Sequence, residues 1–176
     1  MLQPMKPIRA ALARLWRALT TWPDSAGWRF AGLVGGATVL VMAAIGFTGG
    51  LFQVRANYAG LPLRLFAVIF VPALGEEAVF RGLLVPDRSE TARPWAAMAT
   101  ATVLFACWHV VETLFLPHAA AIFLRPDFLA SVVAEGVGCA LIRWRTGSLW
   151  PVVALHWLEV TVWQTWLGGL DIAALS

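Results

Sequence analysis

Residues 30–51 read FAGLVGGATVLVMAAIGFTGGL and contain no charged side chain. About 20 consecutive, predominantly apolar residues are enough for a helix to cross the hydrocarbon core of a bilayer, so this stretch predicts a transmembrane helix. The rest of the chain has a similar character, because 60% of the 176 residues are hydrophobic and 13% are charged. A soluble domain has roughly 45–50% apolar and about 25% charged residues. The sequence therefore predicts a protein whose solvent is lipid.

Four further apolar runs follow, at residues 61–85, 95–116, 119–142 and 148–169. Together with the first run they predict an all-α, multi-spanning transmembrane helical bundle, and the chain length leaves room for about five to six spans in one domain. Arg125, Pro126 and Asp127 interrupt the fourth run. A short re-entrant piece followed by a helix is therefore an alternative at that place.

The first 28 residues differ from the rest because basic and apolar side chains are mixed in them. They predict an amphipathic helix that lies on an anionic membrane surface, followed by a membrane-embedded core over residues 29–176. The residues that carry this pattern are Lys6, Arg9, Arg14 and Arg17, with Leu12, Leu15, Trp16, Leu19 and Trp22.

The basic residues also predict the orientation, since Lys and Arg are retained on the cytoplasmic side of short loops. With five spans, one side receives only Arg55 and Arg125. The loops around residues 86–94 and 143–147 and the N-terminus should then face the cytoplasm, and we expect substrate to enter from the cytoplasmic leaflet. The net charge of +3 fits this membrane pattern and gives no indication of nucleic-acid binding. The residues on the cytoplasmic side are Lys6, Arg9, Arg14, Arg17, Arg29, Arg88, Arg93, Arg143 and Arg145.

Several ionisable residues fall inside the predicted spans, where a charge near the bilayer centre costs about 2.5–3.5 kcal/mol on insertion scales. Such residues usually face a protein interior and mark a functional site. They are Glu76, Glu77 and Arg81 in the second span, His109 and Glu112 in the third, Glu135 in the fourth, and His156 and Glu159 in the fifth.

Helix geometry separates the roles of the residues in the second span. Arg81 lies four positions after Glu77 and can pair with it, whereas Glu76 points in a different direction. Glu76 is then the carboxylate that is free for chemistry. The alternative is that all three residues form a structural salt-bridge cluster, which is weak evidence of function by itself.

Hydrolysis is the chemistry that fits a buried carboxylate near two imidazoles. Glu76 can act as a general base toward water, one imidazole can orient that water, and a second can donate a hydrogen bond to the oxyanion of a tetrahedral intermediate. His109 lies four residues after Phe105, so both rings share one helix face. A buried histidine that only packs is the alternative for His109 and for His156. No serine nucleophile elbow and no HExxH zinc motif is present in the sequence.

Three ordered motifs resemble the CPBP family, which includes the Rce1-type CAAX prenyl endopeptidases and bacteriocin-processing or self-immunity proteins. They are an EExxxR motif at residues 76–81, an FxxxH motif at residues 105–109, and a third motif that runs from Gly147-Ser148-Leu149-Trp150 to His156. The resemblance covers roughly residues 61–169. It implies an all-helical intramembrane endopeptidase in the bacterial inner membrane.

The resemblance also implies that Glu76 and His109 activate water and that His156 forms the oxyanion hole. In the family, Asn or Asp usually follows the third histidine four positions later, whereas Val160 stands there in this chain. Val160 cannot donate a hydrogen bond, so Glu159 or a neighbouring group would have to replace it. We therefore group the catalytic residues as Glu76, Glu77, His109 and His156, with Arg81, Phe105 and Glu159 as supporting residues.

No cofactor is needed for this mechanism, but two alternatives stay open. Glu76, His109 and His156 could instead supply the three protein ligands of a catalytic zinc ion. The chain could also be a non-catalytic membrane protein that binds peptides or confers immunity, or one whose carboxylates relay protons or cations. The expected partners are membrane lipids and a membrane-anchored or C-terminally processed protein, and no nucleic acid.

Overall fold

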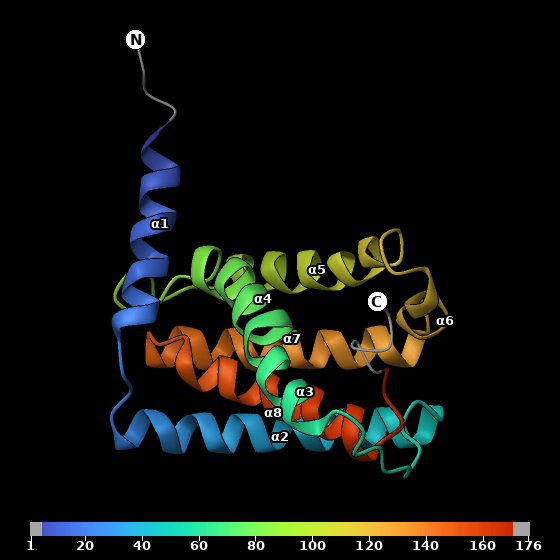
Figure 1. Ribbon diagram of the computed structural model, residues 1–176. Coiled ribbons are helices and arrows are strands. Elements are labelled where there is room, and N and C mark those ends of the chain that lie inside the picture. The colour runs from blue at the N-terminus through green and yellow to red at the C-terminus, as the bar shows by residue number, and fades with distance from the viewer. Residues whose placement is uncertain (1–4, 171–176) are drawn as a thin grey trace.

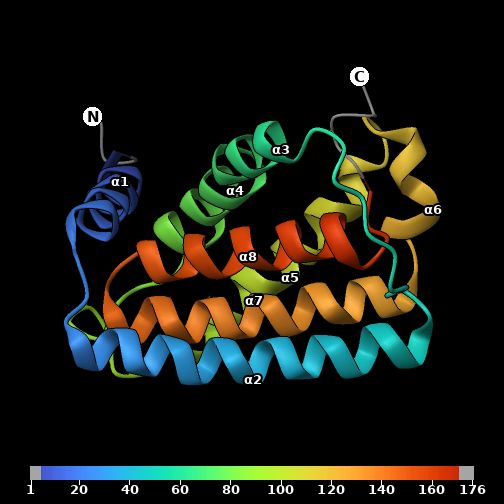
Figure 2. The ribbon, with the colours of Figure 1, turned by 60° about the horizontal axis from the view of Figure 1, so that its bottom comes forward.

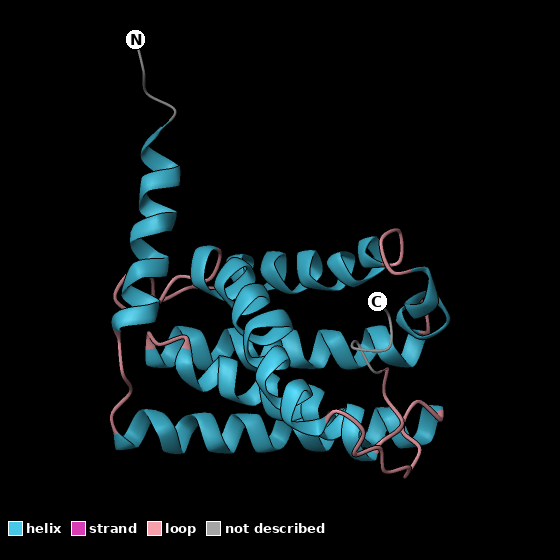
Figure 3. Cartoon of the chain, in the orientation of Figure 1, coloured by secondary structure: helices cyan, strands magenta, loops and turns pink. Residues whose placement is uncertain are grey.

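The computed structural model describes residues 5–170, and the regular elements within them are helices (Figure 3). This confirms the all-α prediction for the described part of the chain. The elements are α1 (Met5–Thr20), α2 (Ser25–Gly49), α3 (Leu61–Val68), the π-helical turn η1 (Ile69–Leu74), α4 (Gly75–Glu77), the π-helical turn η2 (Ala78–Leu83), α5 (Trp95–Glu112), the 3₁₀ turn η3 (Pro117–Ala119), α6 (Ala120–Phe123), α7 (Pro126–Thr146) and α8 (Trp150–Trp166).

Helix α7 lies in the middle of the bundle and packs against α2, α5 and α8, while the segment from α3 to η2 crosses these helices obliquely (Figures 1 and 2). Small residues allow the close approaches. A side chain at Gly138 would collide with Thr38 of α2, and one at Gly136 would press on Thr102 of α5. Helices in membranes associate through such small-residue contacts because lipid tails leave little hydrophobic drive between them.

The predicted span over residues 61–85 is not one straight helix. Val71 has a non-helical backbone (φ −136°, ψ 113°) immediately before Pro72, and proline removes a backbone donor and clashes with the preceding turn. The helix axis therefore breaks at this point, and two π-helical turns flank the three-residue helix α4. Glu76 and Glu77 lie on α4, directly after the break. π-helical turns inside helices are frequent at functional sites.

Among the described residues, two helices are long and apolar enough to cross a membrane by themselves, Ser25–Gly49 and Trp95–Glu112. The count of five to six spans is therefore not confirmed. Three of the expected runs do not form one helix that is long and apolar enough to cross a membrane. The helix over residues 61–85 is broken at Pro72, and residues 119–142 are divided between α6 and α7, a helix with charged residues at both ends. Helix α8, in the last run, has only 17 residues.

Large apolar side chains cover much of the outer surface of the bundle, including Leu33 (76% exposed), Leu40 (72%), Leu63 (64%) and Val103 (60%). Soluble monomers rarely expose extended apolar patches. The exposed side chains therefore support a membrane location for the bundle.

Helix α1 packs against the end of the bundle where α7 leads into α8. Leu15 and Ala18 contact Leu149 and Val153, and the backbone N–H of Leu149 donates to the carbonyl of Ala18. The outer face of α1 carries exposed apolar side chains, among them Trp16. This amphipathic arrangement suits the predicted interfacial helix, although the boundary differs, because α2 already begins at Ser25.

Candidate active site

Adjacent positions on α4 send Glu76 and Glu77 into different surroundings. Arg81 Nη1 donates to Glu77 Oε1 over 2.9 Å, and both side chains are fully buried. The predicted Glu77–Arg81 pair is therefore present. The Arg81 guanidinium carbon also lies 4.0 Å from the centroid of the Phe105 ring, a cation–π contact that helps to hold the cation in place.

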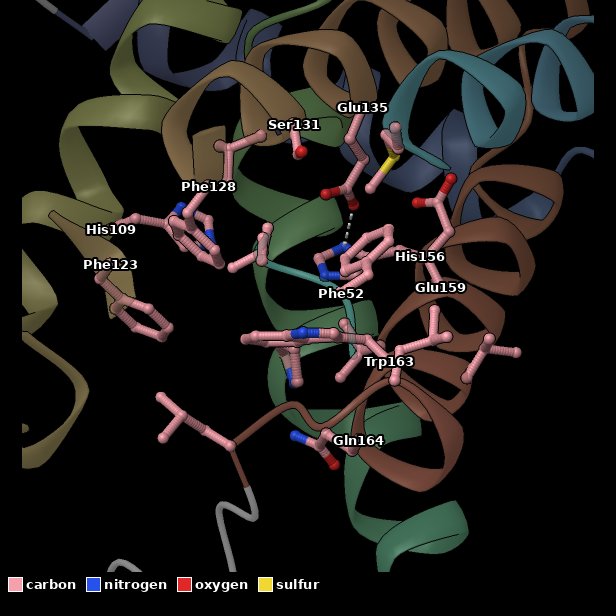
Figure 4. A pocket seen from close by; sticks show the side chains of 18 of the residues that line it. Phe52, His109, Phe123, Phe128, Ser131, Glu135, His156, Glu159, Trp163 and Gln164 are labelled. Carbon is pink, nitrogen blue, oxygen red and sulfur yellow. Dashed lines mark ion pairs between the residues drawn. The ribbon is translucent and has the colours of Figure 1, made fainter. Parts of the chain in front are cut away.

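His156 lies between carboxylates from two other elements. Its Nδ1 atom is 2.9 Å from Glu77 Oε1 and 3.3 Å from Glu135 Oε1, the ion pair marked in Figure 4. Its Nε2 atom is 3.9 Å from Glu76 Oε2. Because an ionised carboxylate only accepts hydrogen bonds, Nδ1 carries the hydrogen toward Glu77. The ring is thus fixed with its Nε2 edge toward Glu76.

His109 lies in the last turn of α5, and its ring packs edge-on against Phe105 with 4.7 Å between the centroids. Its Nδ1 atom is 3.0 Å from the Phe105 carbonyl oxygen. A carbonyl accepts only, so Nδ1 carries the hydrogen and Nε2 of the neutral ring is left as an acceptor. The predicted sharing of one face by Phe105 and His109 is confirmed.

The two oxygens of Glu76 have different partners. Trp108 Nε1 donates to Oε1 over 3.2 Å, whereas Oε2 is buried and has no hydrogen-bond partner among the described residues. Ligand atoms of Glu76, His109 and Glu112 all lie within 4.8 Å of one another. A water molecule in this space could contact Glu76 and His109 together, as general-base activation requires.

These side chains lie at the floor of a cavity of about 270 Å³ that Glu76, His109 and His156 all line. Aromatic rings form a large part of the wall: Figure 4 shows Phe123 and Phe128 on the side of His109, and Trp163 packs against Phe128. The stacked rings of Phe123 and Phe128 are 4.8 Å apart. An apolar wall around a few convergent polar groups is typical of ligand sites.

Several residues of the site were not among the residues selected from the sequence. Glu135 and Glu112 had been noted only as charged residues inside predicted spans. Glu112 lies three positions after His109, on the same helix face, so residue spacing was the signal that could have placed it in the site. Trp108 gave no signal, because a tryptophan in an apolar run looks like any lipid-facing residue. Glu159, selected as a supporting residue, lines the cavity, and both of its carboxylate oxygens are buried without a hydrogen-bond partner in the described part of the chain. Val160 also lines the cavity.

The geometry favours a different metal set from the one suggested by the sequence. Glu76 and His109 lie with Glu112, whereas His156 lies with Glu77 and Glu135. The first set fits a cation, because a ligating histidine commonly donates its other ring N–H to a carbonyl, as His109 does to Phe105. In the second set Glu77 is already paired with Arg81 and His156.

The fold and this cavity together define a helical membrane protein with a glutamate and two histidines gathered at the floor of an apolar pocket. A scan against protein families matches residues 58–162 to the family described as type II CAAX prenyl endopeptidase Rce1-like. The chain belongs to this family, which confirms the resemblance seen in its three motifs. The family is one of membrane proteases, so the chain is assigned to the peptidases. Comparisons with curated proteins and with solved structures gave no match.

Proposed function

We propose that the protein is an intramembrane endopeptidase that hydrolyses a peptide bond of a membrane protein, with water activated by Glu76 and His109. The observation that carries this proposal is the buried Oε2 atom of Glu76, which has no hydrogen-bond partner within residues 5–170 and faces the cavity near His156 Nε2. A desolvated carboxylate that lacks a partner is placed to bind and deprotonate a water molecule.

In the proposed reaction, Glu76 takes a proton from water while His109 Nε2 orients the same water. The hydroxide forms a bond to the carbonyl carbon of the scissile peptide, and the carbonyl oxygen becomes an oxyanion. His156 Nε2–H donates to this oxyanion, which requires hydrogen on both ring nitrogens and uses Glu77 and Glu135 as counter-ions. The C–N bond then breaks, and Glu76 returns its proton to the leaving amine.

Glu77 and Arg81 act in this proposal as positioning residues. Glu77 Oε1 is already engaged by Arg81 and by His156, so it holds the imidazole rather than contacting substrate. Phe105 is also a positioning residue, because its ring contacts the Arg81 guanidinium and its carbonyl oxygen accepts a hydrogen bond from His109 Nδ1. This narrows the catalytic set expected from the sequence to Glu76, His109 and His156.

The test is the isosteric substitution Glu76→Gln in protein reconstituted into vesicles with single-span reporter proteins. General-base catalysis contributes typically about 10²–10⁴-fold, so we expect cleavage to fall by at least about a hundredfold while reporter binding persists. Glu90→Gln, at the far end of the bundle, is the matched control and should cleave normally. Undiminished cleavage by Glu76→Gln would show that this carboxylate is not the base.

A metal-dependent version of the reaction is the second candidate, favoured by the grouping of Glu76, His109 and Glu112. A bound zinc ion would polarise the carbonyl and lower the pKa of its water, with these three residues as ligands. A strong chelator separates the two candidates. Cleavage that survives the chelator supports the metal-free reaction, and cleavage that is lost and returns on adding zinc supports the metal site.

The proposed location is the bacterial inner membrane, with the N-terminus in the cytoplasm. The support is the unequal distribution of basic residues between the two ends of the bundle, which under the positive-inside rule assigns the richer end to the cytoplasm. Membrane lipids and a membrane-anchored protein substrate are the proposed partners.

A further inference from the structure

One end of the cavity is lined by residues that follow helices on the same side of the bundle. Leu51 and Phe52 come shortly after the end of α2, Leu116 after α5 and Leu167 after α8, and all four line the cavity. Figures 1 and 2 show these helix ends gathered at the end where α6 and the α2–α3 connection lie. The mouth of the cavity is therefore formed by the helix ends that connect on this side of the bundle.

The basic residues gather at the other end. Arg14 and Arg17 of α1, Arg29 of α2, the loop residues Arg88 and Arg93, and Arg143 and Arg145 at the end of α7 all lie there. The cavity end has Arg55, Arg125 and also Arg64, which the sequence analysis did not count. Arg125 is paired with Asp127, and Arg64 is 3% exposed. With Arg9 of α1, eight described arginines lie at the basic end against three at the cavity end, and this asymmetry assigns the cavity mouth to the extracytoplasmic side.

Packed side chains close the bundle between the site and the basic end. Ala31, Cys139, Ile142 and Val152 form one buried cluster from α2, α7 and α8, and Val85, Met98, Ala101 and Ala140 form another. Protein interiors packed in this way leave few voids that could admit a peptide. The floor of the cavity is therefore sealed toward the cytoplasm.

The contact between α2 and α8 separates the tightly packed half of the bundle, toward the basic end, from the half that contains the cavity. These helices touch at Gly35, where an added Cβ atom would lie 3.2 Å from Leu155 Cδ1. Beyond this contact, Val39 and Met42 of α2 and Leu158 of α8 line the cavity. Val39 and Leu158 are also 39% and 49% exposed. Val39 and Leu158 thus belong both to the cavity wall and to the lipid-facing surface, in the half of the bundle away from the basic end.

We infer that the substrate is a membrane protein segment that enters sideways from the extracytoplasmic leaflet, between α2 and α8, with its scissile bond in the outer half of the bilayer. This inference rests on the proposed peptidase function. It differs from the entry through the cytoplasmic leaflet that the charge pattern alone suggested. The apolar wall fits an apolar peptide segment, because such a segment can move from the lipid into the cavity without burying a charged side chain.

The charges of the cavity narrow the substrate further. No Lys or Arg is among its described lining residues, whereas Glu76, Glu112, Glu135 and Glu159 line it. A free C-terminal carboxylate would enter among these four carboxyl groups, and the imidazolium that the proposed reaction requires at His156 is already paired with Glu77 and Glu135. No uncompensated cation is left among the described lining residues to receive the carboxylate, which is unfavourable in a low dielectric. The cavity therefore selects an internal segment over the free C-terminus that the family description associates with CAAX processing.

Cysteine labelling of intact cells tests the side of entry without depending on activity. Ala56 and Ala92 are both exposed, one at the cavity end and one in the loop at the basic end, so Ala56→Cys and Ala92→Cys are matched probes in a background with Cys107→Ala. Cys139 can remain, because it is 0% exposed. An impermeant maleimide should label Ala56→Cys at once and Ala92→Cys only after permeabilisation. The reverse pattern overturns the inference.

Cleavage of paired reporters tests the substrate class. Two single-span reporters carry the same apolar segment, placed in the outer half of the bilayer in one and in the inner half in the other. We expect cleavage of the outer reporter alone, with at least about a tenfold loss in Ala43→Trp, which fills the α2 wall of the cavity, and no change in Ala44→Trp, which faces outward.

The outcomes separate the two proposals. Cleavage of the inner reporter, alone or with the outer one, overturns the leaflet inference and leaves the peptidase function intact. Cleavage of neither reporter counts against the peptidase function, and the labelling pattern then still decides on which side the cavity opens. Equal cleavage by Ala43→Trp and by wild type overturns the entrance between α2 and α8.

Discussion

Replacing Arg81 by methionine removes the cation that neutralises Glu77 inside the bundle. Both side chains are fully buried and joined over 2.9 Å, and removal of one partner of a buried ion pair costs about 3–5 kcal/mol because the other charge is left uncompensated. His156 stays 2.9 Å from Glu77 and compensates in part. We therefore expect Arg81→Met to lower the free energy of unfolding by about 3 kcal/mol, near the lower end of that range.

The assay is reversible unfolding in mixed micelles by a denaturing detergent, followed by tryptophan fluorescence. Glu77→Gln combined with Arg81→Met leaves no buried charge in the pair and should recover most of the loss, so that the two single effects are not additive. Arg17→Met is the control, since the Arg17–Glu90 pair is partly exposed and worth about 0–1 kcal/mol. If Arg81→Met costs no more than Arg17→Met, or if the single effects add, the buried pair is not what stabilises this helix.

Two further predictions concern the oxyanion site and helix α1. If His156 alone donates a hydrogen bond to the oxyanion, His156→Ala should lower kcat by about 10²–10³-fold, the usual loss for one such donor. Val160→Asn should retain or raise turnover in the same reporter assay, and a loss of turnover in Val160→Asn would contradict this prediction. Partial burial opposes ionisation of Glu90, but hydrogen bonds from Arg14 outweigh it and lower the pKa of Glu90. The stabilisation of α1 by Glu90 should therefore be fully present above a pH of about 4.3, the unperturbed pKa of glutamate. It should be lost as the pH falls through the lower pKa that Glu90 has in the folded protein. Hydrogen exchange of the α1 amides should show this pH dependence, and Glu90→Gln should abolish the pH dependence.

Contacts within one helix could be predicted from the sequence because helix geometry fixes them. The Glu77–Arg81 pair and the shared face of Phe105 and His109 are both spaced by four positions, and both are present. The all-helical fold followed in the same way from long apolar runs. In these cases residue spacing alone determines which side chains meet.

Contacts between helices could not be predicted in the same way. A span that is apolar on every face gives no hydrophobic periodicity from which to read its rotation, so the approach of Trp108 to Glu76 and of Glu135 to His156 was not anticipated. The break at Pro72 was missed because transmembrane helices often contain proline without ending. The grouping of Glu112 with Glu76 and His109, in place of His156, depends on that break and on the rotation of α5.

Part of the cavity wall comes from outside the region of the chain that supplies the floor. The floor residues Glu76, His109 and His156 all lie within residues 58–162, the region that matches the family. Met42 and Phe52, and Leu167 after α8, form walls from outside that region. The wall formed by α2 and the segment after it can therefore vary without any change in the hydrolytic residues, so transplanting residues 25–57 between members of this family is expected to alter substrate preference while leaving those residues in place.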